Sequence, residues 1–359
     1  MPPDSNDATA VVFCEGNFGT QDGKTANGLA RHSEKYRILS VIDSTKTGLD
    51  TGDVLGDGPS GIPICSDLGA AIDLAGVVPD VFIFGKAPAS GLLSPFERGV
   101  VFEAIERGMD IVNGLHEFLN DDPAFVIAAT LHGVKLIDVR RPRDKKHLRL
   151  FTGRIFDVSC PRIAVLGTDS AIGKRTTAEV LTRALHDYGI NAVFVATGQT
   201  GIIQGARYGV ALDAIPGQFC SGEMEATVLE AYENERPDVL IIEGQGALSH
   251  PAYLSSVFIL RGSQPQAVIL QHAPARTSLG DFPDLKMPSP SSEIDLIQAF
   301  ADTTVIGLTI NHESMTDDEV SEAIVHYEDL LGIPATDALT RSPQRLVDMV
   351  LRAFPELER

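Results

Sequence analysis

A turn between an apolar strand and a helix, with a glycine at each end of its loop, is the feature that most constrains how this chain folds. It runs from Gly167 to Thr177 with the sequence GTDSAIGKRTT, directly after the apolar run IAVL. The glycines allow the backbone to curl until several N–H groups face inward, and the start of the helix adds partial positive charge. Lys174 adds a full positive charge. The sequence therefore predicts an anion-binding cradle at the end of a strand.

The residues of this turn are the expected phosphate-binding residues. They are Gly167, Thr168, Asp169, Ser170, Ala171, Ile172, Gly173, Lys174, Arg175 and Thr176. In a nucleotide-hydrolysing P-loop the residue after the lysine is Ser or Thr, whose hydroxyl binds magnesium. Here that residue is Arg175, and hydroxyls follow one and two positions later. Magnesium therefore stays open as a cofactor but is disfavoured, and no protein metal site is expected.

Short β-branched runs alternate with amphipathic stretches along the whole chain, which is typical of parallel sheets covered by helices. In the first half we predict strands at 10–14, 37–43, 80–84 and 110–112 and helices at 25–33, 67–75 and 95–107. In the second half we predict strands at 162–166, 192–196, 238–242, 266–270 and 304–310, and helices at 176–187, 223–234, 293–301, 317–331 and 343–354. The fold expected is α/β, with an N-terminal Rossmann-like domain at 1–150 and a C-terminal doubly wound domain of P-loop NTPase type at 151–359.

A basic segment at 136–155 interrupts this rhythm, and we place the domain boundary there. Its charges lie around Pro142, at Arg140, Arg141, Arg143, Lys145, Lys146 and Arg149. One interpretation is a solvated linker. The other is a surface along an interdomain cleft that holds an anionic ligand.

The overall charge excludes several classes of partner. A formal net charge of −20 over 359 residues argues against nucleic acid and against an anionic membrane, because both require fields of Lys and Arg. The four cysteines lack the spacing of a zinc site. No apolar run approaches the length of a membrane span. We therefore expect a cytoplasmic homo-oligomer that binds a small molecule.

A second polar loop follows the strand predicted at 238–242, in the sequence DVLIIEGQGALSHP. Glu243 stands where a P-loop protein carries the acid that faces its phosphates, and His250 follows closely. Asp169 and Glu243 together would share a cation or orient a substrate ammonium. The alternatives are a structural carboxylate for Glu243 and an ordinary loop histidine for His250.

These motifs resemble known families. GTDSAIGK and IIEGQG are similar to the phosphate turn and acidic segment of dethiobiotin synthetase-type P-loop proteins, and Asn311 is placed like the residue that reads adenine there. The fuller resemblance is to a family long labelled as a domain of unknown function, which includes D-glutamate N-acetyltransferase. It is carried by GTDSAIGKRTT, TGQTGIIQG, DAIPGQFCSGEME and IEGQGALSHPAY in the second half, and by CEGNFGTQDGKTANGLAR and NGLHEFL in the first.

The second resemblance implies acetyl-coenzyme A as the donor and an acidic D-amino acid, D-glutamate, as the acceptor of an N-acetyltransferase. A P-loop without its magnesium hydroxyl would hold the phosphates of coenzyme A without hydrolysing them, with Asn311 reading the adenine. Two other functions stay open: an ATP-dependent ligase or kinase of the dethiobiotin synthetase type, and a protein that senses a coenzyme or nucleotide.

Acetyl transfer to an amine needs a group that removes a proton. His116 and His250 are the candidates for base or orienting residue, and Glu243 is the alternative base. The carboxylates of the acceptor call for arginine, whose planar fork suits them. Arg207 and Arg276 are the substrate-binding candidates, beside the Arg140–Arg141 pair.

Lys24 is a further substrate-binding candidate. It lies at the end of a glycine-rich stretch, 16–25, that leads from the first predicted strand into a helix. This stretch is either a plain strand–helix connection or a loop that holds a substrate carboxylate through backbone N–H groups and Lys24.

Overall fold

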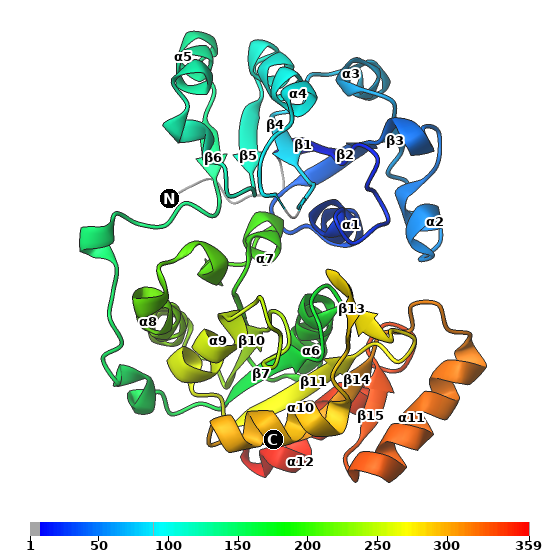
Figure 1. The fold of residues 1–359 in the computed structure, drawn as a ribbon, viewed down its shortest axis with the longest axis vertical. Helices are drawn as coiled ribbons and strands as arrows, with labels where there is room; N and C mark the ends of the chain where they lie inside the picture. Colours follow the sequence, from blue (N-terminus) through cyan, green and yellow to red (C-terminus); the bar gives the residue numbers. More distant parts are fainter. Residues whose placement is uncertain (1–7, 89, 359) are drawn as a thin grey trace. The chain divides into compact units, whose positions relative to one another are not determined.

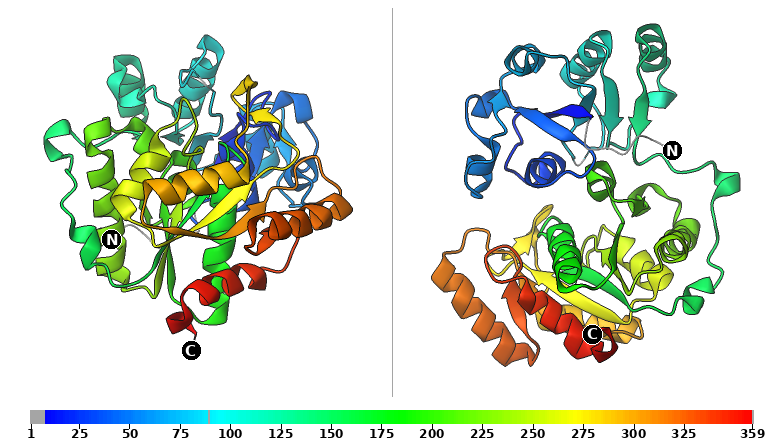
Figure 2. Two further views of the ribbon diagram at one scale, coloured as in Figure 1. Left: turned by 60° about the horizontal axis from the view of Figure 1, so that its bottom comes forward. Right: turned by 180° about the vertical axis from the view of Figure 1, so that it is seen from behind.

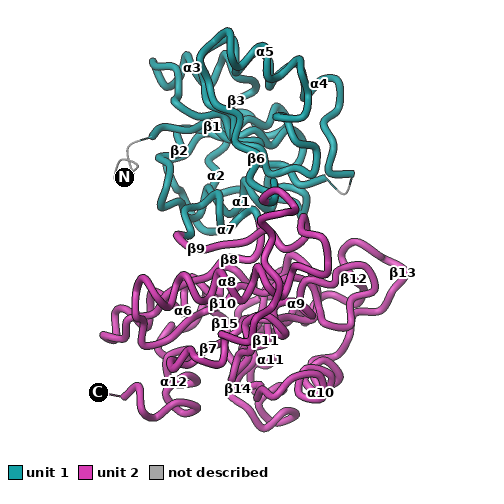
Figure 3. The backbone as a smooth tube through the Cα atoms, turned by 90° about the vertical axis from the view of Figure 1, so that its left-hand side faces the viewer, with its two compact units in different colours: residues 1–142, 199–206 teal, residues 143–198, 207–359 magenta. Residues whose placement is uncertain are grey.

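The computed structural model describes residues 8–88 and 90–358 and divides the chain into two compact units (Figure 3). The first unit comprises Met1–Pro142 together with Gln199–Ala206, and the second comprises Arg143–Gly198 and Arg207–Arg359. The boundary predicted from sequence places the short segment 199–206 in the second domain, whereas in the structure this segment belongs to the first unit.

The first unit contains one parallel sheet in the order β3-β2-β1-β4-β5-β6 (Figure 1). Its strands are β1 (Thr9–Phe13), β2 (Arg37–Ile42), β3 (Ile64–Cys65), β4 (Val81–Phe84), β5 (Asp110–Asn113) and β6 (Leu136–Asp138). Its helices are α1 (Lys24–Arg31), α2 (Thr51–Leu55), α3 (Leu68–Ala75), α4 (Pro95–Glu106) and α5 (Pro123–His132). This strand order is that of dinucleotide-binding folds and confirms the predicted Rossmann-like domain.

Alternate residues of each central strand bury into two separate cores. On β1, Val11 and Phe13 pack with α3, α4 and α5, whereas Ala10 and Val12 pack with α1. The second core also takes Ile203 from helix α7 (Gln199–Gln204). Helix α7 is fastened to α1 because Gln204 Nε2 donates to the carbonyls of Gly28 and His32 at 2.9 and 2.7 Å.

The second unit is built on a seven-stranded parallel sheet in the order β15-β14-β11-β7-β10-β8-β9. Its strands are β7 (Arg162–Gly167), β8 (Ala192–Ala196), β9 (Tyr208–Gly209), β10 (Val239–Glu243), β11 (Ala267–His272), β14 (Thr304–Ile310) and β15 (Ala335–Asp337). A separate hairpin joins β12 (Ser278–Leu279) to β13 (Phe282–Lys286). The predicted doubly wound sheet is confirmed, and it carries two short edge strands, β9 and β15, that the sequence pattern does not predict.

Helices cover both faces of this sheet (Figures 1 and 2). They are α6 (Lys174–Tyr188), α8 (Gly217–Glu235), α9 (Ser255–Ser263), α10 (Pro290–Phe300), α11 (Asp317–Leu331) and α12 (Gln344–Ala353). On β7, Ile163 and Val165 pack with α6 and α12, whereas Ala164 and Leu166 pack with α8, α9 and α10. Successive strand side chains point to opposite faces, so a buried parallel strand is apolar throughout.

The basic segment near the domain boundary is held by charges and carbonyls of its own unit. Its first residues, 136–138, form the edge strand β6 instead of a linker. Arg140 is buried and donates to the carbonyl of Gly114, and Arg141 pairs with Asp121 at 2.7 Å. These pairings do not support the interpretation in which both arginines hold a ligand.

The end of the basic segment docks on helix α8 through residues 222–225, the GEME part of the motif DAIPGQFCSGEME. Glu223 accepts hydrogen bonds from the backbone N–H and guanidinium of Arg149 at 2.6 to 3.2 Å. Glu225 accepts from Thr152 and Ile155. A Cβ at Gly222 would run into the carbonyl of Arg149, so glycine is required there. This motif therefore anchors the connection in the structure.

All four cysteines are buried and unbridged. Among the helices of the described residues, none combines the length and apolarity needed to cross a membrane.

Candidate functional site

The Gly167–Thr177 turn joins the end of β7 to the start of α6 and presents open backbone N–H groups. Ala171 has φ 49° and Gly173 φ 99°, which curl the chain between strand and helix. Among the described residues, no acceptor lies within hydrogen-bonding distance of the N–H groups of 171–173, 175 and 176. A row of inward N–H groups at a helix start is the arrangement that binds phosphate oxygens.

The carbonyl groups of residues 169–172 in the same turn are held by side chains. Lys174 Nζ donates to the carbonyl of Asp169, and Arg276 donates to those of Ser170 and Ala171 at 3.2 and 3.3 Å. Asn311 Nδ2 donates to the carbonyl of Ile172 at 3.0 Å. Each of these carbonyls is engaged by a side chain, whereas the N–H groups of 171–173, 175 and 176 have no partner among the described residues.

Asn311 was predicted to read adenine and Arg276 to bind the substrate, and in the structure both side chains contact the turn. The amide oxygen of Asn311 accepts the N–H of Glu313 while its nitrogen holds Ile172, so both ends of the amide are engaged. Arg276 pairs with Glu313 and with the buried carboxylate of Asp169. Both side chains brace the turn, and reading adenine or a substrate carboxylate would break these bonds.

The position whose hydroxyl would bind magnesium carries an arginine. This residue, Arg175, pairs with Glu179 at 3.2 Å. The hydroxyl of Thr177 donates to Gln271 Oε1 at 2.6 Å inside the sheet. Gln271 lies in none of the motifs identified from the sequence. The sequence feature that marks it is a polar side chain within the buried strand AVILQH. Within the described residues, no three His, Cys, Asp or Glu side chains gather into a metal-binding group.

His250 reaches the turn from the loop after β10. Its Nδ1 accepts the N–H groups of Ala252 and Tyr253, both at 3.2 Å, so the proton of the neutral ring lies on Nε2. Nε2 is buried without a hydrogen-bond partner in the described residues and lies 3.9 Å from Asp169 Oδ1. Burial lowers the pKa of His250, so the ring is a neutral hydrogen-bond donor at neutral pH.

Glu243 ends β10 and is 5% exposed. It accepts the N–H of Thr197 at 2.8 Å, and the Thr197 hydroxyl donates to the Glu243 carbonyl at 3.0 Å. Burial raises the pKa of Glu243 to about 7, although the positive charge of Arg175 opposes the shift. A carboxylate with a pKa near neutrality is suited to general base catalysis.

His272, the last residue of β11, is a packing residue. Its Nδ1 lies 2.9 Å from the Thr168 hydroxyl and its Nε2 lies 3.0 Å from the Tyr327 hydroxyl. Burial lowers its pKa to about 4, which keeps the ring neutral. The hydroxyl of the predicted phosphate-binding residue Thr168 is thereby engaged by a side chain.

Three further predicted site residues are divided between the units: Arg207 belongs to the second, and His116 and Lys24 belong to the first. Arg207 is exposed and pairs with Glu235, at the end of the helix that leads into β10 and therefore at the amino edge of the sheet. His116 is exposed in the loop after β5 of the first unit. Lys24 is exposed at the start of α1.

The start of α1 does not form a second N–H cradle. The N–H groups of Gly23 and Lys24 donate to carbonyls of their own loop, and that of Ala26 donates to the carbonyl of Gly85 at 3.1 Å. Several of the backbone groups that were expected to hold a substrate carboxylate are therefore engaged, which favours the alternative of a plain strand–helix connection.

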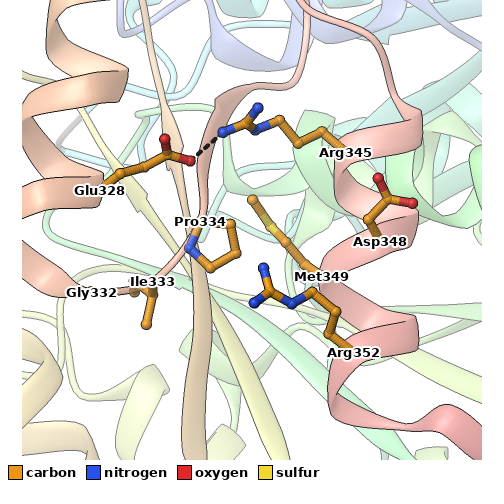
Figure 4. Close-up of a pocket in the computed structure, with 8 residues that line it drawn as sticks. All are labelled: Glu328, Gly332, Ile333, Pro334, Arg345, Asp348, Met349 and Arg352. Carbon is orange, nitrogen blue, oxygen red and sulfur yellow. Dashed lines mark hydrogen bonds and ion pairs between the residues drawn. The ribbon is translucent and has the colours of Figure 1, made fainter.

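A surface hollow of about 410 Å³ lies away from the turn, between the end of α11 and helix α12 (Figure 4). Residues 332–334 lead into β15, so the hollow lies at the amino edge of the sheet. Glu328 and Arg345 pair across it. The phosphate turn lies at the opposite, carboxyl edge, where open α/β sheets bind ligands.

The fold and the turn define a P-loop protein with a Rossmann-like first domain, and family models agree. Residues 44–142 match a model described as a domain of unknown function (DUF1611_N), Rossmann-like domain. Residues 149–347 match one described as a domain of unknown function (DUF1611_C), P-loop domain. The chain belongs to the DUF1611 family.

Relatives of known structure or name support this membership. A crystal structure of a DUF1611 family protein from Anabaena variabilis is 30% identical, with a TM-score of 0.88 over 96% of this chain and 100% of that chain. A protein of Pseudoalteromonas sp named D-glutamate N-acetyltransferase is 34% identical over 264 residues, which are 72% of this chain and 77% of its own. One of the same name from Tritonibacter scottomollicae is 32% identical over 272 residues, 74% and 79% of the two chains.

Proposed function

We propose that this protein is an N-acetyltransferase that moves an acetyl group from acetyl-coenzyme A to the amino group of D-glutamate. One observation carries the proposal: the turn offers open N–H groups for phosphate, while Arg175 and the diverted Thr177 hydroxyl leave no magnesium-binding hydroxyl at the usual place. Such a turn anchors a phosphorylated coenzyme and is poorly built to split a nucleotide. The names of the two relatives supply the reaction and the acceptor.

The side chains around the turn suit the steps of this reaction. When bound, acetyl-coenzyme A supplies an acetyl group activated as a thioester. The N–H groups of 171–176 and Lys174 bind its phosphates. Glu243, with its pKa of about 7, accepts the proton that the attacking amine must lose. Nε2–H of His250 donates to an oxygen of the bound donor. Of the candidate bases, we therefore favour Glu243 and give His250 the part of a donor.

The test is to mix the full chain with acetyl-coenzyme A and single amino acids while thiol release is measured. We expect release with D-glutamate and little with L-glutamate or with D-amino acids that lack a second carboxylate. Parallel assays with ATP and magnesium measure ADP. Absence of thiol release together with magnesium-dependent ADP formation would replace the proposal by the ligase or kinase alternative. Tight binding of coenzyme A without turnover on any amino acid would favour a sensor.

A further inference from the structure

The β12–β13 hairpin stands apart from the central sheet and is fastened at its tip to the phosphate turn. The N–H of Gly280 donates to Asp169 Oδ2 at 2.9 Å, and the hydroxyl of Ser170 donates to Asp281 Oδ2 at 3.1 Å. The hydroxyl of Tyr253 donates to the same oxygen at 2.7 Å. The hairpin, the turn and the loop after β10 therefore meet at Asp281.

Two aromatic rings flank His250 at this junction. The ring of Tyr253 stacks on the imidazole at a centroid distance of 4.4 Å, and the ring of Phe282 is tilted against it at 5.7 Å. Tyr253 is 38% and Phe282 36% exposed, whereas His250 is 4% exposed. Two partly solvent-exposed aromatic rings thus contact a buried imidazole next to the turn.

The buried imidazole between these two rings carries an N–H group without a hydrogen-bond acceptor in the described residues. A buried N–H without an acceptor is unfavourable, and in native structures such a group calls for a ligand or water oxygen. The Nε2–H of His250 is such a group. The hairpin tip beside it is tied, within the described residues, to the turn and to the β10 loop through Gly280 and Asp281.

We propose that Tyr253, His250 and Phe282 form the subsite for the part of the ligand that continues from its phosphates, a pantetheine-type chain of amides ending in a thioester. This inference rests on the proposed function, because a coenzyme A donor carries both phosphates and such a chain. The aromatic faces pack along the chain, and Nε2–H of His250 donates to one of its carbonyl oxygens.

The test compares two ligands that share a phosphorylated adenosine and differ in the chain. Calorimetry with the full-length protein measures binding of coenzyme A and of adenosine 3′,5′-bisphosphate, which lacks the chain. We expect Phe282→Ser to weaken binding of coenzyme A by roughly tenfold and to leave binding of the bisphosphate unchanged. Tyr253→Ser is a second variant with the same expectation. Phe156→Ser is the matched control, because Phe156 is 67% exposed on the same unit and lies in the connection before β7.

Each outcome has a distinct meaning. Unchanged binding of coenzyme A in both variants, or equal weakening of both ligands, would overturn the subsite. A selective loss of coenzyme A binding, in a protein that transfers no acetyl group to any amino acid, would support the subsite and contradict the proposed function alone. Lys174→Ala should weaken both ligands.

Discussion

Arg276 donates from Nη1 to Asp169 Oδ2 at 3.0 Å, and the side chain of Asp169 is completely buried. The same guanidinium holds two carbonyls of the turn and the carboxylate of Glu313. A buried carboxylate that loses its cation is strongly destabilised. The pair therefore fixes the shape of the cradle before any ligand arrives.

Arg276→Ala should reduce the free energy of unfolding by about 3 kcal/mol, because it leaves Asp169 buried and unpaired. It should also raise the KM for acetyl-coenzyme A, because the carbonyls of Ser170 and Ala171 lose the side chain that holds them. Arg276→Lys should recover only part of both effects, because an ammonium lacks the planar fork. Urea denaturation and steady-state kinetics measure these changes. A rise confined to the KM for D-glutamate would instead restore the original prediction that Arg276 binds the substrate.

The activity should depend on pH through Glu243. A base must be deprotonated to act, so kcat/KM should rise with pH through about 7 and then level off. Glu243→Gln should lower kcat by a factor of roughly 100 or more, while binding of coenzyme A stays unchanged. If the Glu243→Gln protein kept the activity and the pH profile of the native protein, Glu243 would have no part in the reaction.

The ionised carboxylate of Glu243 should lower the free energy of unfolding at neutral and higher pH. Because the folded-state pKa of Glu243, about 7, lies above its ordinary value of 4.5, the folded protein binds the proton more tightly. The free energy of unfolding should therefore fall as pH rises from about 4.5 to about 7. Glu243→Gln should stabilise the protein by up to about 3 kcal/mol at pH 8, with a smaller gain at pH 5. Equal stability of the two proteins at both pH values would show that the ionised carboxylate is not penalised.

Gly222 should be intolerant of a side chain. Gly222→Ala places a Cβ against the carbonyl of Arg149 in the docked connection, and we expect a loss of about 3 kcal/mol. Gly99→Ala is the matched control, because a Cβ there meets nothing within 4 Å in helix α4. That change should stabilise the protein by about 0.5 kcal/mol or more. Thermal unfolding of both variants checks this, and equal effects would show that the connection is not anchored at Gly222.

Local features of the chain were predictable from sequence because their causes are local. The turn follows from its glycines and Lys174, and helix α11 begins with the capping box formed by Thr316 and Glu319. Short edge strands such as β9 carry too few residues to show a pattern. Helix α8 begins at Gly217, six residues before the predicted start. Gly217 and Gly222 are weak helix formers, so the sequence does not indicate a helix there, but tertiary packing accommodates both glycines.

The braces of the cradle could not be predicted from local sequence. Arg276 holds carbonyls 105 and 106 residues earlier in the chain, and Asn311 holds one that is 139 residues earlier. Only the fold brings the ends of β7, β11 and β14 to one edge of the sheet. Sequence position marked both residues as site residues but could not distinguish a residue that shapes the site from one that touches the ligand.

The central claim, that the Gly167–Thr177 turn binds coenzyme phosphates without magnesium, is tested most directly by calorimetric titration of coenzyme A with and without EDTA. We predict equal affinity in both conditions for the native protein and a loss of at least roughly tenfold in Lys174→Ala. Lys146→Ala, a change at a side chain that is 73% exposed, should bind like the native protein. Binding that required magnesium, or that survived Lys174→Ala unchanged, would contradict the account.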